Sequence, residues 1–342
     1  MFERFVLLWL MLFAVVGYFA PAPFVAVSAY LDLVIIAAMF FVGTLLRADE
    51  FTQVLKRWPT VLGGVLLQYT SMPLLAFAAA TLFELSPGLT IGVVMTGIVP
   101  GAMSSNAITL LAKGNVSYSV SMTTLATIAA PFLIPFWLLT LLGKNDANTD
   151  ALGMMIQLVQ TVAAPVLIGW IAARFLPKFA GWCRTWGPMA SMLAVFWLMA
   201  TVVAKNRGQI GLLSLQVLPA LVLLNFSGYL AGWLGGKLLR LEESSRRALV
   251  IEIGMQNAGL GTVLVTKWFA GYPEAAVPTA VYTFGCILTG AGLAQFWSQY
   301  PPKTDSPNEP ADEANATDEA SAGDDAGATG DEPLAARPGE AL

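Results

Sequence analysis

One acidic residue stands alone in a long apolar stretch of the chain. Glu252 is the only ionisable side chain in residues 248–265, and Gln256 and Asn257 follow it about one helical turn later. A carboxylate at the centre of a membrane helix costs at least about 2.5–3.5 kcal/mol, so it is expected to face a cavity and a cation. Three interpretations of Glu252 are open: a Na⁺ ligand, a carboxyl group that carries a proton, or a neutral acid that hydrogen-bonds for helix packing.

Other polar residues that could supply oxygen ligands lie in three further apolar stretches. Ser104-Ser105-Asn106 follows a Pro100-Gly101 break, and Gln68 interrupts the stretch VLLQYTSMP. Ser119 and Thr123 are four residues apart and therefore share one face of a helix. A single Ser or Thr in such a helix usually bonds its own backbone, so each signal is weak when taken alone.

The composition sets the class of protein. Of 342 residues, 56% are hydrophobic and 12% are charged, with a mean hydropathy of +0.68. Soluble domains carry about 25% charged residues, so we expect an integral membrane protein. There is no His, and the two Cys lie far apart, which excludes His-based catalysis, His-ligated metal sites and a disulfide framework. No nucleotide-binding motif or nucleophile elbow is found, which argues against ATP-driven transport by this chain alone.

Apolar runs between charged or Pro/Gly breaks predict ten membrane spans, since a bilayer core needs roughly 20 apolar residues per helix. Twelve Lys and Arg fall in loops on one side and four on the other, which favours cytoplasmic N- and C-termini. The predicted spans are approximately residues 4–20, 25–46, 59–82, 88–112, 115–142, 152–174, 186–204, 209–236, 244–269 and 275–298.

The fourth and ninth predicted spans resemble each other. Each is broken near its middle by a polar stretch with Gly or Pro, and each break carries the dipeptide Asn-Ala, at Asn106 and Asn257. Spans five apart must cross the membrane in opposite directions, as in an inverted-topology repeat, and paired broken helices indicate a transporter's central site. We therefore expect repeats of about 1–142 and 152–300. Two ordinary proline or glycine kinks are the simpler alternative.

The tail has a different composition from the rest of the chain. Residues 304–342 contain eleven acidic residues and one Arg, a net charge of −10, against +6 for residues 1–303. With almost no aliphatic or aromatic side chains it cannot bury enough apolar area to fold. We predict a transmembrane domain over 1–303 and a disordered, cytoplasmic acidic tail over 304–342.

The motifs in the broken spans resemble those of the bile acid:sodium symporter family. The similarity is carried by Ser105-Asn106 with the following TLLAKGNVSYSVSMTT, and by IEIGMQNAGL in the ninth span. It implies an all-α, ten-helix fold of two five-helix inverted repeats, with core and panel domains and unwound crossing helices 4 and 9. It also implies a first sodium site of Ser105, Asn106, Ser119, Thr123 and Glu252, and a second of Gln68, Glu252, Ile253, Met255 and Gln256.

On the substrate side, the resemblance implies an anion held between core and panel, with Asn257 at the crossover. Met103 stands where relatives commonly carry a small or hydroxyl residue such as Thr, and Cys286 where some bacterial members carry His, and these departures argue against a bile-acid-like substrate. The family also transports smaller acids, so the expected anion is either bile-acid-like or a smaller carboxylate. We expect a sodium-coupled importer in the cell's inner membrane, with Na⁺ and an organic anion as partners. No cofactor, nucleic acid or obligate protein partner is expected. The alternatives are a carrier of the same superfamily not coupled to sodium (proton-coupled or of the arsenite-efflux type), or an intramembrane sensor or enzyme.

Overall fold

The computed structural model describes residues 6–45, 58–143, 151–208, 210–300 and 302, and every regular element in these ranges is helical. Among these residues, five helical stretches are long and apolar enough to cross a membrane: Trp58–Leu82, Val116–Leu142, Leu152–Phe175, Gly211–Leu238 and Pro273–Ser298. The chain is therefore a multi-pass membrane protein. The acidic tail (304–342), and the basic residues Arg4, Arg47, Lys56, Arg57 and Lys144 used for the orientation, lie outside the described residues.

The described helices and helical turns are the following. In chain order they are α1 (Val6–Phe19), α2 (Ala22–Ala26), the 3-10 turn η2 (Val27–Tyr30), α3 (Leu31–Leu45), α5 (Trp58–Leu82), α6 (Pro87–Ile98), α7 (Ser104–Leu111), α8 (Val116–Leu142), α9 (Ala151–Leu158), the π-helical turn η3 (Val159–Ala163), α10 (Ala164–Phe175), α11 (Pro177–Asn206), α12 (Ile210–Leu238), α13 (Glu243–Gly254), α14 (Ala258–Trp268), the 3-10 turn η4 (Pro273–Ala275) and α15 (Ala276–Ser298).

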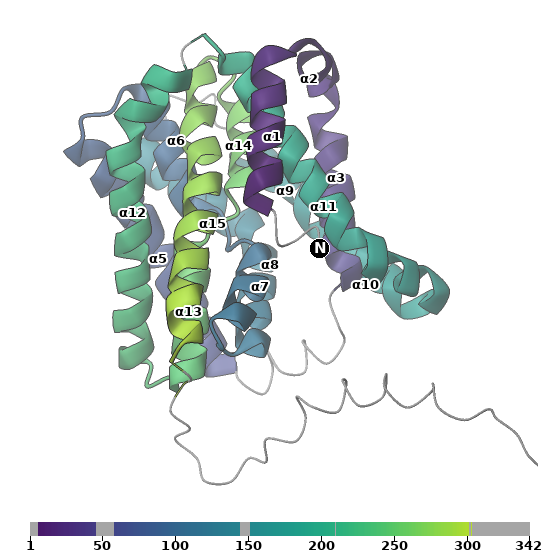
Figure 1. The fold of residues 1–342 in the computed structure, drawn as a ribbon, viewed down its shortest axis with the longest axis vertical. Coiled ribbons are helices and arrows are strands. Elements are labelled where there is room, and N and C mark those ends of the chain that lie inside the picture. Colours follow the sequence, from purple (N-terminus) through teal and green to yellow (C-terminus); the bar gives the residue numbers. More distant parts are fainter. Residues whose placement is uncertain (1–5, 46–57, 144–150, 209, 301, 303–342) are drawn as a thin grey trace, which may run out of the picture. The chain divides into compact units, whose positions relative to one another are not determined.

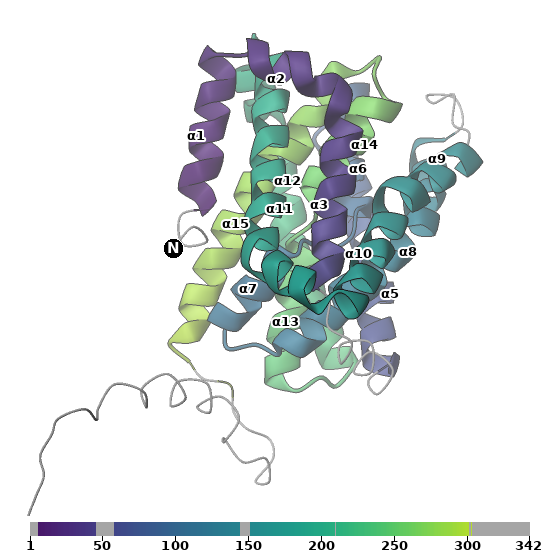
Figure 2. The same cartoon turned by 90° about the vertical axis from the view of Figure 1, so that its right-hand side faces the viewer.

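Two groups of helices differ in their packing partners. α3 packs along α10 and α11, and α1 packs along α11; α1, α3 and α11 face the viewer in Figure 2. Gly43 permits the close approach of α3 to α10, because a Cβ there would lie 2.0 Å from the Val166 carbonyl oxygen. We call α1, α3, α10 and α11 the flanking group. The helices α5 to α8 and α12 to α15 pack mainly on one another and form the site group.

Apolar side chains fill the inside of the site group and also join it to the flanking group. Met72 of α5 and Met122 of α8 are fully buried in one cluster. A second cluster brings Phe196 and Met199 of α11 against Leu260 and Leu264 of α14. The two groups therefore meet along α11 and α14.

Two helices are broken at their middles, and the breaks cross each other. α6 ends at Ile98 before Pro100, which has no N–H to continue a helix, and α13 ends at Gly254. The extended segments pair as an antiparallel bridge between Gly101 and Gln256. The Ala102 N–H donates to the Met255 carbonyl at 2.8 Å, and the Asn257 N–H donates to the Pro100 carbonyl at 2.8 Å. Figure 1 shows α6 and α14 in the upper half and α7 and α13 in the lower half. We call this pairing the crossover.

The crossover also sets the register between the two breaks, which the Asn-Ala dipeptides alone leave open. Gly101 pairs with Gln256, so Asn106 lies five residues beyond the bridge while Asn257 lies one residue beyond it. Asn257 is the N-cap of α14 and accepts a hydrogen bond from the Leu260 N–H at 3.1 Å. Asn106 is inside the first turn of α7. The two asparagines therefore do not occupy equivalent positions.

Candidate functional site

The Glu252 carboxylate lies in the last turn of α13, and its side chain is 0% exposed. Three hydroxyl groups donate hydrogen bonds to it: Ser105 of α7 at 2.5 Å, and Ser119 and Thr123 of α8 at 3.1 and 2.5 Å. Gly101 leaves room for this carboxylate, because a Cβ there would lie 2.0 Å from Glu252 Oε1. Four residues predicted for one sodium site thus meet at one point. We call them the hydroxyl cluster.

The charge of the hydroxyl cluster is not balanced by a basic side chain. Among the residues that the structure describes, the one ion pair is that of Arg247 with Glu243, and Glu252 takes part in none. A buried carboxylate without a basic partner is costly. The site therefore suits a cation, and the hydroxyl oxygens can help to bind it, since each has lone pairs left after donating its proton.

Two amide oxygens near the crossover lack a hydrogen-bond donor. Asn106 Oδ1 and Gln68 Oε1 are both buried and accept no hydrogen bond within the described part of the chain. Leaving a buried acceptor unsatisfied costs about 1–3 kcal/mol. A cation bound by these oxygens would remove that cost, so both residues fit the ligand role that the sequence predicts for them.

A second set of predicted residues is joined on the other side of the crossover. Gln68 of α5 donates through Nε2 to Gln256 Oε1 at 3.3 Å, and Gln256 donates to the Ile253 carbonyl at 2.8 Å. The Met255 carbonyl already accepts the Ala102 N–H. These carbonyl oxygens each retain a second lone pair. The structure thus places the residues predicted for the second site next to those of the first.

A pocket reaches the hydroxyl cluster from the flanking group. Met103, Asn106 and Thr123 line it from the site group, and Val42 of α3 and Val166 of α10 from the flanking group. Thr124, which also lines it, has a buried hydroxyl oxygen without a partner among the described residues. The Thr124 hydroxyl makes no hydrogen bond to Glu252, unlike that of its neighbour Thr123. The pocket thus borders two of the predicted sodium ligands, Asn106 and Thr123.

Of the three predicted substrate residues, Met103 and Asn257 are the N-cap residues of α7 and α14, the two helices that begin at the crossover. Met103 lines the pocket just described, and Asn257 caps α14. Cys286 of α15 is 2% exposed and packs in the apolar cluster that contains Met255 and Tyr282. Its thiol donates only to the Thr283 carbonyl, at 3.6 Å. In this structure Cys286 is therefore a buried packing residue behind the crossover.

Two further side chains, not predicted from the sequence, hold the end of α13. Asn225 of α12 and Tyr282 of α15 both donate to the Gly254 carbonyl, each at 2.9 Å. The last carbonyls of a helix have no partner within the helix, so these bonds satisfy one of them. A signal for Asn225 exists in the sequence, because VLLNF at 222–226 repeats the pattern VLLQY at 65–69 around Gln68.

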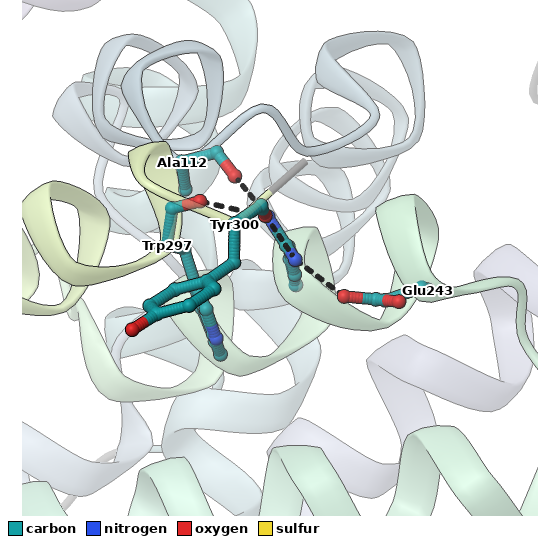
Figure 3. A network of polar contacts seen from close by, with 5 residues as sticks. Ala112, Glu243, Trp297 and Tyr300 are labelled. Carbon is teal, nitrogen blue, oxygen red and sulfur yellow. Dashed lines mark hydrogen bonds and ion pairs between the residues drawn. The ribbon is translucent and has the colours of Figure 1, made fainter. Parts of the chain in front are cut away.

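Arg247 ties the other end of α13 to two neighbouring elements (Figure 3). Its guanidinium, on a side chain 3% exposed, donates to the carbonyls of Ala112, Trp297 and Tyr300 at 3.0, 3.2 and 2.7 Å and pairs with Glu243. Ala112 ends α7, which carries Ser105, and Arg247 is five residues before Glu252. Arg247 therefore fixes α7 and α13 relative to each other on one side of the hydroxyl cluster.

Comparison of the sequence with known proteins finds sodium-dependent transporters. The family model described as the Sodium Bile acid symporter family matches residues 32–213. A protein named uncharacterized sodium-dependent transporter YocS, from Bacillus subtilis (strain 168), is 35% identical over 292 residues, which cover 85% of this chain and 90% of the relative. A probable sodium/metabolite cotransporter, chloroplastic BASS1 of Arabidopsis thaliana, is 34% identical over 86% of this chain and 74% of its own length. A similar chloroplastic protein of Oryza sativa subsp. japonica, BASS2, is 32% identical over 84% of this chain and 69% of its own length.

Proposed function

The chain belongs to the sodium bile acid symporter family, and from this premise we propose that it is a sodium-coupled symporter that imports an organic anion. The family and the relatives are transporters, so the chain is a transporter and not an enzyme. Transport in this family needs no cofactor beyond Na⁺ as the coupling ion. The imported anion is bile-acid-like or a smaller carboxylate.

The observation that carries the proposal is the buried Glu252 carboxylate, surrounded by hydroxyl groups and lacking a basic partner. The unsatisfied oxygens of Asn106 and Gln68 support it further. We assign one Na⁺ to the hydroxyl cluster with Asn106. A second Na⁺ is assigned to Gln68, Gln256 and the carbonyls of Ile253 and Met255, with Glu252 shared between the sites.

The proposal includes an architecture. The ten predicted spans form two inverted repeats, the flanking group acts as the panel and the site group as the core. The crossing of two broken helices, one from each half of the chain, supports this assignment. The protein lies in the inner membrane with both termini in the cytoplasm. Residues 1–303 form the transport domain, and the acidic tail is disordered.

Sodium and the anion act on the same structural element in this mechanism. Na⁺ bound at Glu252 and Gln256 stabilises the extended segments in the crossing geometry. The N-termini of α7 and α14 meet at the crossover, and their dipoles favour a negative charge there. Asn257 and Met103 stand at these N-termini and contact the anion. Movement of one helix group against the other then exposes the site to either side of the membrane. The ligands shift the equilibrium between these two states only by as much as their affinities for the two states differ.

Uptake into liposomes tests the proposal. Purified protein is reconstituted, and uptake of radiolabelled taurocholate, a sulfated steroid, pantoate and pyruvate is measured with an inward Na⁺ gradient, an inward proton gradient or neither. We expect uptake of at least one anion under the Na⁺ gradient alone. Uptake that follows only the proton gradient would assign Glu252 a proton-carrying role and contradict sodium coupling.

A further inference from the structure

A face of α11 presents polar side chains at the boundary between the two helix groups. Trp197, Thr201 and Lys205 are spaced four residues apart, so they lie on one side of this helix. Trp197 packs against Val263 of α14 in a small apolar cluster. Thr201 and Lys205 line a pocket whose opposite wall includes Thr266 of α14. This pocket is separate from the one at Asn106 and Thr123. We call it the Lys205 pocket.

The Lys205 pocket has a positively charged lining residue but no acidic one. Lys205 is its charged side chain, and no Asp or Glu is among the residues that line it. The hydroxyl protons of Thr201 and Thr266 are used by backbone carbonyls of their own helices. Deeper on the same face, the buried indole N–H of Trp197 has no acceptor among the described residues. The two threonine oxygens therefore offer only acceptor lone pairs. The groups that can donate to an anion are the Lys205 ammonium of the lining and the Trp197 N–H, which lies outside the lining.

The pocket is also close to the crossover. Thr262 lines it, and the Thr262 hydroxyl donates to the carbonyl of Ala258, the first residue of α14, at 2.9 Å. Four residues of helix correspond to about 6 Å. The lining residue Thr262 thus lies little more than one helical turn from Asn257 and the N-terminus of α14. The pocket lies between α11 and α14, where the proposed movement of the two groups would widen it.

A lysine at the end of a membrane helix is often only an interfacial anchor. Lys205 and Arg207, two residues further on, are both exposed, but Arg207 does not line the pocket. Lys205 differs from it because it borders a cavity that contains Thr201, Thr262 and Thr266. A single positive charge in a recess without acids raises the local concentration of anions.

We propose that the Lys205 pocket is an outer recognition site in which Lys205 binds the carboxylate or sulfonate head group of the anion before it reaches the crossover. The inference rests on the proposed function for the identity of the transported solute and for the side of the membrane. The site itself has a test that needs no transport, because a charged thiol reagent reports the electrostatic potential inside the pocket.

The experiment places a cysteine in the pocket and measures its reaction with two membrane-impermeant thiosulfonates of similar size, the anionic sulfonatoethyl and the cationic trimethylammonioethyl reagent. Ala270→Cys stands at the exposed mouth and Thr266→Cys one turn deeper, and both positions line the pocket. The full-length chain without an introduced cysteine, whose two native cysteines are buried, gives the background labelling. The reagents are applied to the outside of spheroplasts for different times. The cysteine that remains unreacted is then labelled with a fluorescent maleimide, and its decrease with time gives the reaction rate. Thr81→Cys, exposed at the end of α5, is the control position.

The expected result is a higher ratio of anionic to cationic rates in the pocket than at Thr81→Cys. Lys205→Gln should lower the pocket ratio about tenfold, on the order of threefold for each reagent, and Lys205→Arg should preserve it. Arg207→Gln, the matched control, should change it less than about twofold. The effect should shrink in high concentrations of choline chloride, since salt screens exposed charges.

Three results would overturn the proposal. They are an unchanged ratio after Lys205→Gln, an equal effect of Arg207→Gln, and labelling of both pocket cysteines from the inside only. These outcomes are distinct from a failure of the proposed function, which shows as absent Na⁺-driven uptake in liposomes while the pocket still prefers the anionic reagent.

Discussion

Replacing Thr123 by Val changes the hydroxyl cluster with almost no change in side-chain shape. The Thr123 hydroxyl donates to Glu252 Oε1 at 2.5 Å, and its oxygen keeps lone pairs for an ion. A hydrogen bond to a charged group contributes about 1.5–3 kcal/mol. If the loss of this ligand weakens Na⁺ binding by about 1.4–2.8 kcal/mol, the apparent Na⁺ affinity falls roughly 10- to 100-fold. Stability without Na⁺ should also fall, because the bond to Glu252 exists in that state.

The next residue offers a matched control for this prediction. Thr124 is in the same helix turn and buried, but its hydroxyl oxygen has no hydrogen-bond partner among the described residues. The assay is the midpoint of thermal unfolding in detergent, titrated with NaCl at constant ionic strength in choline chloride. Thr123→Val should need at least tenfold more Na⁺ than wild type for half of the stabilisation, and Thr124→Val less than threefold more. Equal Na⁺ requirements for the two variants would refute the assignment of Thr123 as a ligand.

Three further predictions concern Asn106, Arg247 and the tail. Asn106→Ala should raise the Na⁺ concentration for half-maximal uptake without changing which anions are accepted at saturating Na⁺; a changed anion preference would move Asn106 to the substrate site. Arg247→Gln should destabilise the protein by about 3–5 kcal/mol, because it leaves buried partners unpaired. Arg247→Lys should recover only part of this, since one ammonium cannot bond all four partners, whereas Arg246→Lys should unfold like wild type. Deletion of residues 304–342 should leave Na⁺-dependent uptake near wild type, because the segment has no apolar anchor; normal insertion with lost uptake would show a direct role for the tail.

The hydroxyl cluster shows how far the sequence could lead. Glu252 was conspicuous because no other charge lies near it in the chain, and the family motif indicated Ser105, Ser119 and Thr123 as its companions. Their convergence depends on packing between α7, α8 and α13, which no local pattern encodes. Asn225 and Tyr282 were missed for the same reason, since their partner is a backbone carbonyl at the end of another helix.

Arg247 and the Asn-Ala dipeptides show what the sequence patterns leave open. In the sequence, Arg247 counts as one more positive charge at the cytoplasmic end of a span. In the structure it is buried and bonded to three carbonyls, a role that charge counting cannot separate from an interfacial one. The repeated dipeptide at Asn106 and Asn257 indicated two broken helices correctly. It did not indicate equivalent positions, because the register is set by the bridge between Gly101 and Gln256.

The most direct test of sodium coupling is Na⁺-gradient-driven uptake by Glu252→Gln in liposomes, measured beside its stabilisation by Na⁺. The substitution keeps the shape and one carbonyl oxygen but removes the negative charge from a side chain that is 0% exposed. A buried cation that loses its charged partner typically loses several kcal/mol, and about 1.4 kcal/mol is tenfold in affinity. The variant should insert normally, lose Na⁺-driven uptake by orders of magnitude and show no stabilisation at Na⁺ concentrations that saturate wild type. Uptake and stabilisation at wild-type Na⁺ concentrations would contradict the role of Glu252 as the sodium ligand.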